Sequence, residues 1–407
     1  MPNTVQVPGV GGPQATPPTA QQRSISFDQA AHRGVEQSQV FAGIQLGGAA
    51  LGTAQVTLGN GPISLLPQGY MRGVLIDIIT TTAANNGTAN GDWPFSLFSL
   101  LRLHDTNGAT MTEITGLHDY YLNLFSGTIG ETSDLSQFPD YSNSATSPSC
   151  QFYLPVELDS DGFGALANQS AADTYKLDAI LDSPANNYTA APTVNNPIFT
   201  VTVFLDYWTI PGASDMLGRP QQQEPPYHGV AAYAYQSTAN NFSAGQGTLK
   251  IGFTGNQFKN LIVTGRAAGT GYATGGARAA ATLPNPYTLR YDTRDLMIGT
   301  LRENRRNWFS YLCTPTTTFL TGIMAFNWNY ARSRRLGGTS PPPNSFVSWL
   351  PTLPATRFEL TGTYGAGTVD YLVNTVSVAE TNPALRGVSP NLTGYQPPVA
   401  ATVPGAQ

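Results

Sequence analysis

Two His-Asp pairs lie close together in the first third of the chain and could, by residue type, bind a metal ion. They are His104-Asp105 and His118-Asp119. Metal ligands must converge on one point, whereas adjacent residues on a strand or a helix point in divergent directions. We therefore expect ordinary polar residues at a strand end and on a helix flank, and we expect neither a metal nor another cofactor.

A glycine-rich stretch, residues 265–276 (GRAAGTGYATGG), is similar in composition to a phosphate-binding loop. A phosphate cradle needs glycines that lead from a strand directly into a helix. Here alanine-rich sequence follows, and then Leu283-Pro284-Asn285-Pro286, whose prolines interrupt regular structure. This pattern favours a surface loop.

Arginines make up the basic clusters of the chain. The clusters are Arg302, Arg305 and Arg306, and then Arg332, Arg334 and Arg335. Neither is interleaved with aromatic residues on which bases could stack, and the formal net charge of the chain is −5. We expect no sequence-specific binding of nucleic acid, and we interpret both clusters as salt bridges or contacts with other subunits.

The composition is typical of a chain whose surfaces are largely covered by neighbours. Its 407 residues exceed the usual size of one hydrophobic core, so two domains are expected. Hydrophobic residues account for 41% but charged residues for only 11%, against about 25% in an average soluble domain. The N-terminus does not read as a signal peptide, and Cys150 and Cys313 lack metal-site spacing and are expected to be buried free thiols.

The pattern of predicted elements that positions these residues occurs twice along the chain. Residues 47–211 and 246–380 each hold alternating β-type runs, one helix-like insert, and a long β-type run at the end. The inserts are 114–125 and 294–311, and the closing runs are 198–208 and 369–378. Short strands separated by regular turn signals predict an all-β sandwich in each unit.

The segments outside the two units have a different composition. Residues 1–46 are predicted to form an N-terminal arm in which a short helix starts within 23–46. Residues 212–245 form a connector rich in proline and glutamine, and residues 381–407 form an extended tail.

Several segments resemble the double jelly-roll major capsid proteins of tectiviruses and related icosahedral phages with an internal membrane. These segments are residues 69–76 (GYMRGVLI), 80–86 (TTTAANN), 100–108 (LLRLHDTNG), 115–118 (TGLH), and 291–296 (YDTRDL) leading to an arginine-rich stretch with Trp308. The resemblance covers most of residues 25–380 in layout. It implies two tandem eight-stranded antiparallel jelly rolls with short helical inserts.

The resemblance also implies a function. Three chains would form a pseudo-hexagonal homotrimer that tiles an icosahedral shell, and the protein would lie in the virion after assembly in the host cytoplasm. Its partners would be neighbouring copies, vertex (penton) and minor capsid proteins, and an internal viral membrane. Arg23, Phe27 and Arg33 would then contact the inner face of the shell or the membrane.

Two other functions stay open. A glycan-cleaving hydrolase built on two jelly rolls would need an acidic cluster between its units, for which Asp206, Asp215 and Glu224 are the candidates. A carbohydrate- or receptor-binding spike would instead line a shallow groove with surface tyrosines and tryptophans. No serine or cysteine has the context of a nucleophile motif, and we expect a protein without enzymatic activity.

Overall fold

The computed structural model describes most of both units. The described residues are 27, 29–126, 134–158, 164–211, 224–225, 229–267, 277–308, 321–328, 349–352 and 356–377. Predictions that concern Arg23, Cys313, the 332–335 arginines and most of the glycine-rich stretch fall outside these residues.

The first unit is a sandwich of two antiparallel sheets. One sheet has the order β1-β12-β4-β8. The other continues from β10 through β6 to β7, with the short strands β2 and β3 both paired to β10. The strands are β1 (Arg33–Gln45), β2 (Val56–Thr57), β3 (Ile63–Ser64), β4 (Tyr70–Thr82), β6 (Phe98–His104), β7 (Thr110–Ile114), β8 (Ser149–Pro155), β10 (Lys176–Leu181) and β12 (Ile198–Trp208).

The second unit repeats this arrangement. Its sheets have the orders β13-β22-β16-β19 and β15-β21-β17-β18. The strands are β13 (Ala232–Gln236), β15 (Gly245–Lys250), β16 (Asn256–Ala267), β17 (Tyr287–Tyr291), β18 (Arg294–Gly299), β19 (Ile323–Asn327), β21 (Phe358–Tyr364) and β22 (Gly367–Ser377). If β2 and β3 are counted as one interrupted strand and strands are numbered in chain order, both units have sheets 1-8-3-6 and 2-7-4-5. The predicted tandem of eight-stranded jelly rolls is confirmed.

Shorter elements complete the two units. They are the helices α1 (Gln29–His32), α2 (Gly116–Ser126), α3 (Pro184–Asn187) and α4 (Leu301–Trp308), the 3-10 turns η1 (Leu58–Asn60), η2 (Phe95–Leu97), η3 (Leu135–Gln137) and η5 (Ala280–Thr282), and the strands β5 (Thr88–Ala89), β9 (Leu166–Ala167), β11 (Tyr188–Ala190), β14 (Asn240–Phe242) and β20 (Leu350–Pro351). Within the described part of the chain, none of the helices is long and apolar enough to span a membrane.

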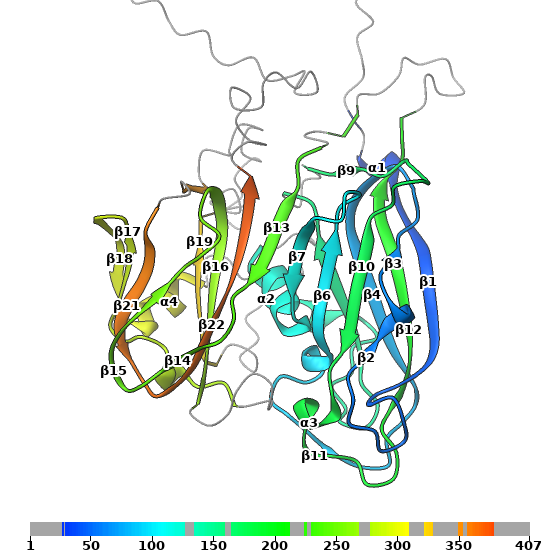
Figure 1. Ribbon diagram of the computed structural model, residues 1–407, viewed down its shortest axis with the longest axis horizontal. Coiled ribbons are helices and arrows are strands. Elements are labelled where there is room, and N and C mark those ends of the chain that lie inside the picture. Colours follow the sequence, from blue (N-terminus) through cyan, green and yellow to red (C-terminus); the bar gives the residue numbers. More distant parts are fainter. Residues whose placement is uncertain are drawn as a thin grey trace, which may run out of the picture.

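The two jelly rolls stand side by side and share one sheet (Figure 1). β7 of the first unit pairs in parallel with β13 of the second, which aligns Thr112 with Ala234 and Glu113 with Tyr235. An eleven-stranded sheet therefore runs from one unit into the other. α2 lies between the units, where it contacts β8 and β6 on one side and β16, β19 and β22 on the other.

The two closing runs are central strands. β12 lies between β1 and β4, and β22 lies between β13 and β16. In β12 the residues Phe199, Val201, Val203 and Leu205 point inward and have no accessible surface, while the residues between them are half-buried. Strict alternation of this kind places every second side chain of β12 in the core of the sandwich. The prediction that the closing runs are long β-strands is confirmed.

The short helix predicted within 23–46 is present in the described residues as Gln29–His32, but the prediction that all of residues 1–46 form an arm is wrong, because Arg33–Gln45 forms β1, an outer strand of the first jelly roll. A Cβ atom at Gly34 would lie 2.7 Å from the Tyr207 ring, so glycine permits the close approach of β1 to β12. The connector also contributes strands, because β13 and β14 both lie within 212–245.

The predicted helix at 294–311 is a strand followed by a helix. Asp292 has φ +51° and turns the chain so that Arg294–Gly299 pairs with β17 as a hairpin. The helix begins only at Leu301, where Thr300 and Glu303 cap each other: the Thr300 backbone N–H donates to Glu303 Oε2 at 2.7 Å, and the Glu303 N–H to Thr300 Oγ1 at 3.4 Å. This capping box, rather than the apolar spacing upstream, sets the start of the helix.

Candidate functional site: the seam between the two jelly rolls

α2 is held to the first jelly roll by a buried carboxylate. Asp119 has no accessible surface, and its oxygens accept from the Tyr153 backbone N–H at 2.9 Å and from Asn123 Nδ2 at 3.2 Å. Asn123 Nδ2 also donates to the Tyr153 carbonyl at 2.7 Å. Burial raises the pKa of Asp119 well above its usual range. The residue that the sequence placed on a helix flank instead fixes α2 against β8.

His118, the neighbour of Asp119, connects α2 to the second jelly roll. Its ring is fully buried, with Nδ1 2.8 Å from Thr115 Oγ1 and Nε2 3.7 Å from Asp370 Oδ1 in β22. His104 lies elsewhere, with Nε2 2.9 Å from Asp178 on β10. Nowhere in the described residues do three histidine, cysteine, aspartate or glutamate side chains gather as a metal site would require.

A buried ionic contact across the seam is centred on Asp92. Its carboxylate lies 2.7 Å from Arg266 Nη2 and 2.6 Å from Arg278 Nε. Arg278 Nη1 also donates to the Tyr121 hydroxyl at 2.8 Å. Asp92 belongs to the first unit and both arginines to the second, and all three side chains are almost fully buried. We call Asp92, Arg266 and Arg278 the seam cluster.

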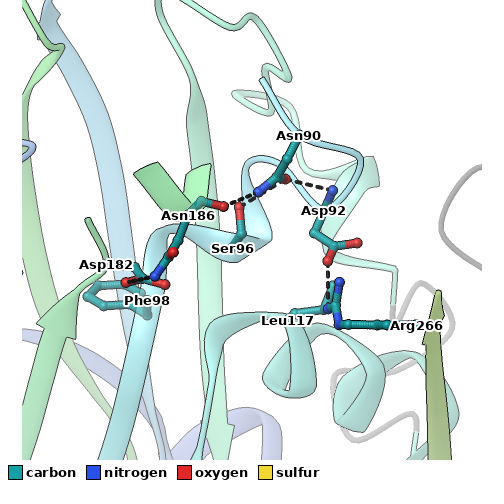
Figure 2. A pocket seen from close by; sticks show the side chains of 8 residues that line it. All are labelled: Asn90, Asp92, Ser96, Phe98, Leu117, Asp182, Asn186 and Arg266. Atoms are coloured by element: carbon teal, nitrogen blue, oxygen red, sulfur yellow. Dashed lines mark hydrogen bonds and ion pairs between the residues drawn. The ribbon is translucent and has the colours of Figure 1, made fainter. Parts of the chain in front are cut away.

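A small polar pocket adjoins the seam cluster (Figure 2). It is lined by Asn90, Asp92, Ser96, Phe98, Leu117, Asp182, Asn186 and Arg266. The lining groups bond to one another: Asn90 Oδ1 accepts from the Asp92 N–H at 2.8 Å, and Asn186 Nδ2 donates to Asp182 Oδ1 at 2.8 Å. These bonds orient the loop that presents Asp92 to Arg266.

Apolar contacts also cross the seam. The main hydrophobic core of the first unit includes residues from four strands of the second, β13, β16, β19 and β22: Ala234, Ile262, Ile323, Ala325 and Leu372. The opposite faces of β16, β19 and β22 cover the separate core of the second unit with Leu261, Met324 and Val373. This sheet of the second unit is therefore buried on both faces, and the two units form one continuously packed body.

A second buried charge cluster lies within the first jelly roll. Arg72 contacts Glu157 through two nitrogens, with Nη2 2.9 Å from Oε2, and its Nη1 lies 3.1 Å from Asp206 Oδ1. Its guanidinium lies 4.1 Å from the centre of the Trp208 ring, and the Tyr153 hydroxyl donates to Asp206 Oδ2 at 3.0 Å. We call Arg72, Glu157 and Asp206 the basal cluster.

Burial and pairing shift the pKa values of the basal cluster in definite directions. Burial raises the pKa of Glu157 to about 7, even though hydrogen bonds from Arg72 oppose the shift. Burial also acts to lower the pKa of Arg72, but the hydrogen bonds and charge of Glu157 outweigh it and raise that pKa above its usual range. Arg72 therefore stays charged at every accessible pH.

Of the predicted inner-face residues, Arg33 contacts the basal cluster, and Phe27 contacts Trp208, whose ring packs on Arg72. Phe27 stacks on His32 at 5.2 Å between ring centres and meets the edge of Trp208 at 5.4 Å. Arg33 is mostly exposed and lies 3.7 Å from Asp206. Arg23 lies outside the described residues. Both described residues thus pack beside α1 and the beginning of β1 at one end of the first jelly roll, and their role toward a membrane stays a prediction.

The other predicted site residues fall into three groups. Arg302, Arg305 and Arg306 are exposed on α4, while Arg332, Arg334 and Arg335 lie outside the described residues. Of the acidic candidates, Asp206 belongs to the basal cluster, Asp215 is outside the described residues, and Glu224 is exposed and hydrogen-bonded to Tyr70. Cys150 is a buried free thiol, as predicted.

No family model and no curated protein sequence matches this chain. Solved structures do match. The crystal structure of the STIV MCP has a TM-score of 0.55 at 13% identity and covers 84% of this chain and 96% of that chain. A chain in the atomic structure of Sulfolobus Turreted Icosahedral Virus scores 0.56 at 13% identity, with 89% and 95% covered.

A third similar structure is that of VP54 from PBCV-1. It scores 0.52 at 11% identity and covers 84% of this chain and 93% of that one. This chain has the double jelly-roll fold of viral capsid proteins. At these identities the likeness is one of fold, and it extends over nearly the whole length of each structure.

Proposed function

We propose that this chain is a major capsid protein. Three copies would form a pseudo-hexagonal capsomer in which each chain supplies two of six jelly rolls, and capsomers would tile an icosahedral shell. One observation carries the proposal: two jelly rolls with the same strand order are fixed side by side by a shared sheet and a buried ionic seam. A shell tiled by capsomers needs rigid, structurally equivalent units of this kind.

Surface chemistry supports the same role. A shell subunit covers its sides with neighbours, and such interfaces are depleted of charge at their centres. The chain has 11% charged residues and 10% aromatic residues. Jelly rolls also leave loops at their ends, which can vary without disturbing the core.

The acidic candidates for catalysis favour a structural role over hydrolysis. Asp206 is almost fully buried and is engaged by Arg72, Arg33 and the Tyr153 hydroxyl. A carboxylate held in this way stabilises the fold and is not presented to a substrate. We therefore propose that the chain acts without enzymatic activity.

The remaining partners are part of the proposal. Vertex and minor capsid proteins would close the shell, and an internal membrane would face the end of the first jelly roll where Phe27 and Arg33 lie. The exposed arginines of α4 (Arg302, Arg305 and Arg306) would contact neighbouring subunits. The protein would be made in the host cytoplasm and would end in the virion.

The experiment is to measure the mass and shape of the purified chain. Mass photometry should give a trimer, and negative-stain images should show blocks with pseudo-sixfold outlines that form sheets or shells when concentrated. A monomer at all concentrations would overturn the proposal. If that monomer cleaved glycan strands or bound immobilised sugars, the hydrolase or the spike interpretation would replace it.

A further inference from the structure

The strands β1 and β18, each at the end of its sheet, are exposed. In the described part of the chain, β1 pairs only with β12 and β18 only with β17, so each leaves one edge of its sheet open. Nearly every residue of β1 is at least partly exposed, and the same holds for β18. Open edges present unpaired backbone groups to which another strand can add.

Both edges also carry large apolar side chains. Val35 and Val40 in β1 are 52% and 44% exposed, and Leu296 and Ile298 in β18 are 37% and 72% exposed. Soluble proteins usually protect edge strands with charge, proline or a covering segment. Apolar side chains on two open edges indicate that each edge is covered in the assembled protein.

The interior of the chain shows how such edges can be covered. β7 is the fifth strand of the first jelly roll, and β13 is the first strand of the second. These two strands pair in parallel and join the units. By the same numbering, β18 is the fifth strand of the second jelly roll and β1 the first strand of the first. The two open edges are thus the equivalents of the two strands that already meet inside the chain.

We propose that β18 of one copy lies alongside β1 of the next copy, in parallel, and repeats between chains the junction that β7 and β13 form within the chain. This inference rests on the proposed homotrimer and specifies its contact. The contact is heterologous, and a heterologous contact closes into a ring when its rotation allows. Each chain would contact one neighbour through β18 and the other neighbour through β1.

Charge supports a second copy as the occupant. In a parallel arrangement both strands begin at the same end of the contact. β18 begins with exposed Arg294 and Asp295, and β1 begins with exposed Arg33 and also carries exposed Glu36. Each strand therefore presents one basic and one acidic side chain at the same end of the interface, so that Glu36 can lie beside Arg294.

The first test places a lysine on each edge. Ile298→Lys and Val40→Lys should each raise the concentration at which half the trimer dissociates by at least about tenfold, because a charge would face the partner strand. Val194→Lys is the matched control, since Val194 is 64% exposed and belongs to neither edge. Circular dichroism and urea unfolding would show that the variants are folded, and wild-type dissociation in folded edge variants would overturn the inference.

The second test asks which edges meet. Two variants, Val40→Cys and Ile298→Cys, are made in a background in which Cys150 and Cys313 are replaced by alanine. A short bis-maleimide should link chains when the two variants are mixed before assembly, and should link neither variant alone. Links within the Val40→Cys protein alone would show a twofold contact and would overturn the inference.

The two proposals can fail separately. Trimers or shells that assemble without any link between the β1 and β18 cysteines would overturn this inference and leave the capsid function standing. A wild-type chain that stays monomeric would overturn the proposed function itself.

Discussion

The basal cluster and the seam cluster are mirror images in charge. In the basal cluster one arginine, Arg72, lies between two carboxylates, and all three residues belong to the first jelly roll. In the seam cluster one carboxylate, Asp92, lies between two arginines of the other unit. The first cluster ties strands β4 and β12 to the segment after β8. The second ties two jelly rolls together.

The basal cluster therefore affects the stability of the first jelly roll, whereas the seam cluster affects how firmly the two jelly rolls are joined. A buried ion pair adds little net stability compared with apolar residues of the same size, but removal of one partner costs about 3–5 kcal/mol because the other charge stays buried. The central residue of each cluster is therefore the sensitive position. Its loss should destabilise one sandwich in the first case and loosen the junction in the second.

The largest effect is expected for Arg72→Met. This change leaves the buried Glu157 and Asp206 without a counter-charge, so that they must either stay charged in the interior or take up a proton, and it removes the contact with Trp208. The free energy of unfolding at pH 8 should therefore fall by about 4 kcal/mol. Urea unfolding followed by tryptophan fluorescence measures it. Arg102→Met is the matched control, because the partly exposed pair of Arg102 with Glu113 should contribute at most about 1 kcal/mol. Equal losses in the two variants would contradict the role of burial.

A smaller effect of a different kind is expected for Asp92→Asn. The amide oxygen can still accept a hydrogen bond from Arg266 or Arg278, but the two guanidinium charges lose their shared counter-charge. The free energy of unfolding should fall by about 3 kcal/mol. The loss should appear at the junction: hydrogen exchange should rise in α2 and in β16 and β22, while β4 and β12 keep wild-type protection.

Arg72→Met serves as the comparison for the exchange experiment. It should raise exchange in β4 and β12 and leave the strands of the second unit protected. Uniform loss of protection in both variants would mean that the two clusters do not act on separate parts of the molecule.

The fold could be predicted from this sequence to a large extent. The closing run at 198–208 alternates buried and half-buried residues, the closing run at 369–378 is rich in apolar and β-branched residues, and both of these long β-type runs are central strands. The edge strands were harder to identify. β1 mixes glycine, polar and apolar residues because one of its faces and one of its edges are open, so the pattern that marks a core strand is absent. Helical spacing in 294–299 arose by chance in a hairpin.

The clusters could not be found from the sequence, for a physical reason. Asp92 lies more than 170 residues before both Arg266 and Arg278 in the chain, and a lone charge near a strand end usually faces solvent. One signal was present. Arg72 interrupts the apolar run YMRGVLI in a chain that has few charges, and a charge inside a core strand must find a buried partner. That partner, Glu157, follows a strand that pairs with β4, which only the topology reveals.

The last prediction uses pH to probe the basal cluster, which contains a group with a pKa near neutrality. The pKa of Glu157 is about 7 in the folded protein and 4.5 in its ordinary state. Between these values the folded chain binds more protons than the unfolded chain. The contribution of Glu157 to the free energy of unfolding is therefore fully present below pH 4.5. It is lost as the pH rises through 7, with a slope of at most about 1.4 kcal/mol per pH unit.

Glu157→Gln removes this titration while it keeps the shape of the side chain. The variant should gain stability relative to wild type as the pH rises from 4.5 to 7, and the difference should be constant above about pH 8. Asp119 also has a raised pKa, but it is present in both proteins and cancels in the difference. Urea unfolding of both proteins at half-unit steps of pH measures the effect. A difference independent of pH would mean that Arg72 keeps Glu157 ionised throughout, and would contradict the raised pKa of Glu157.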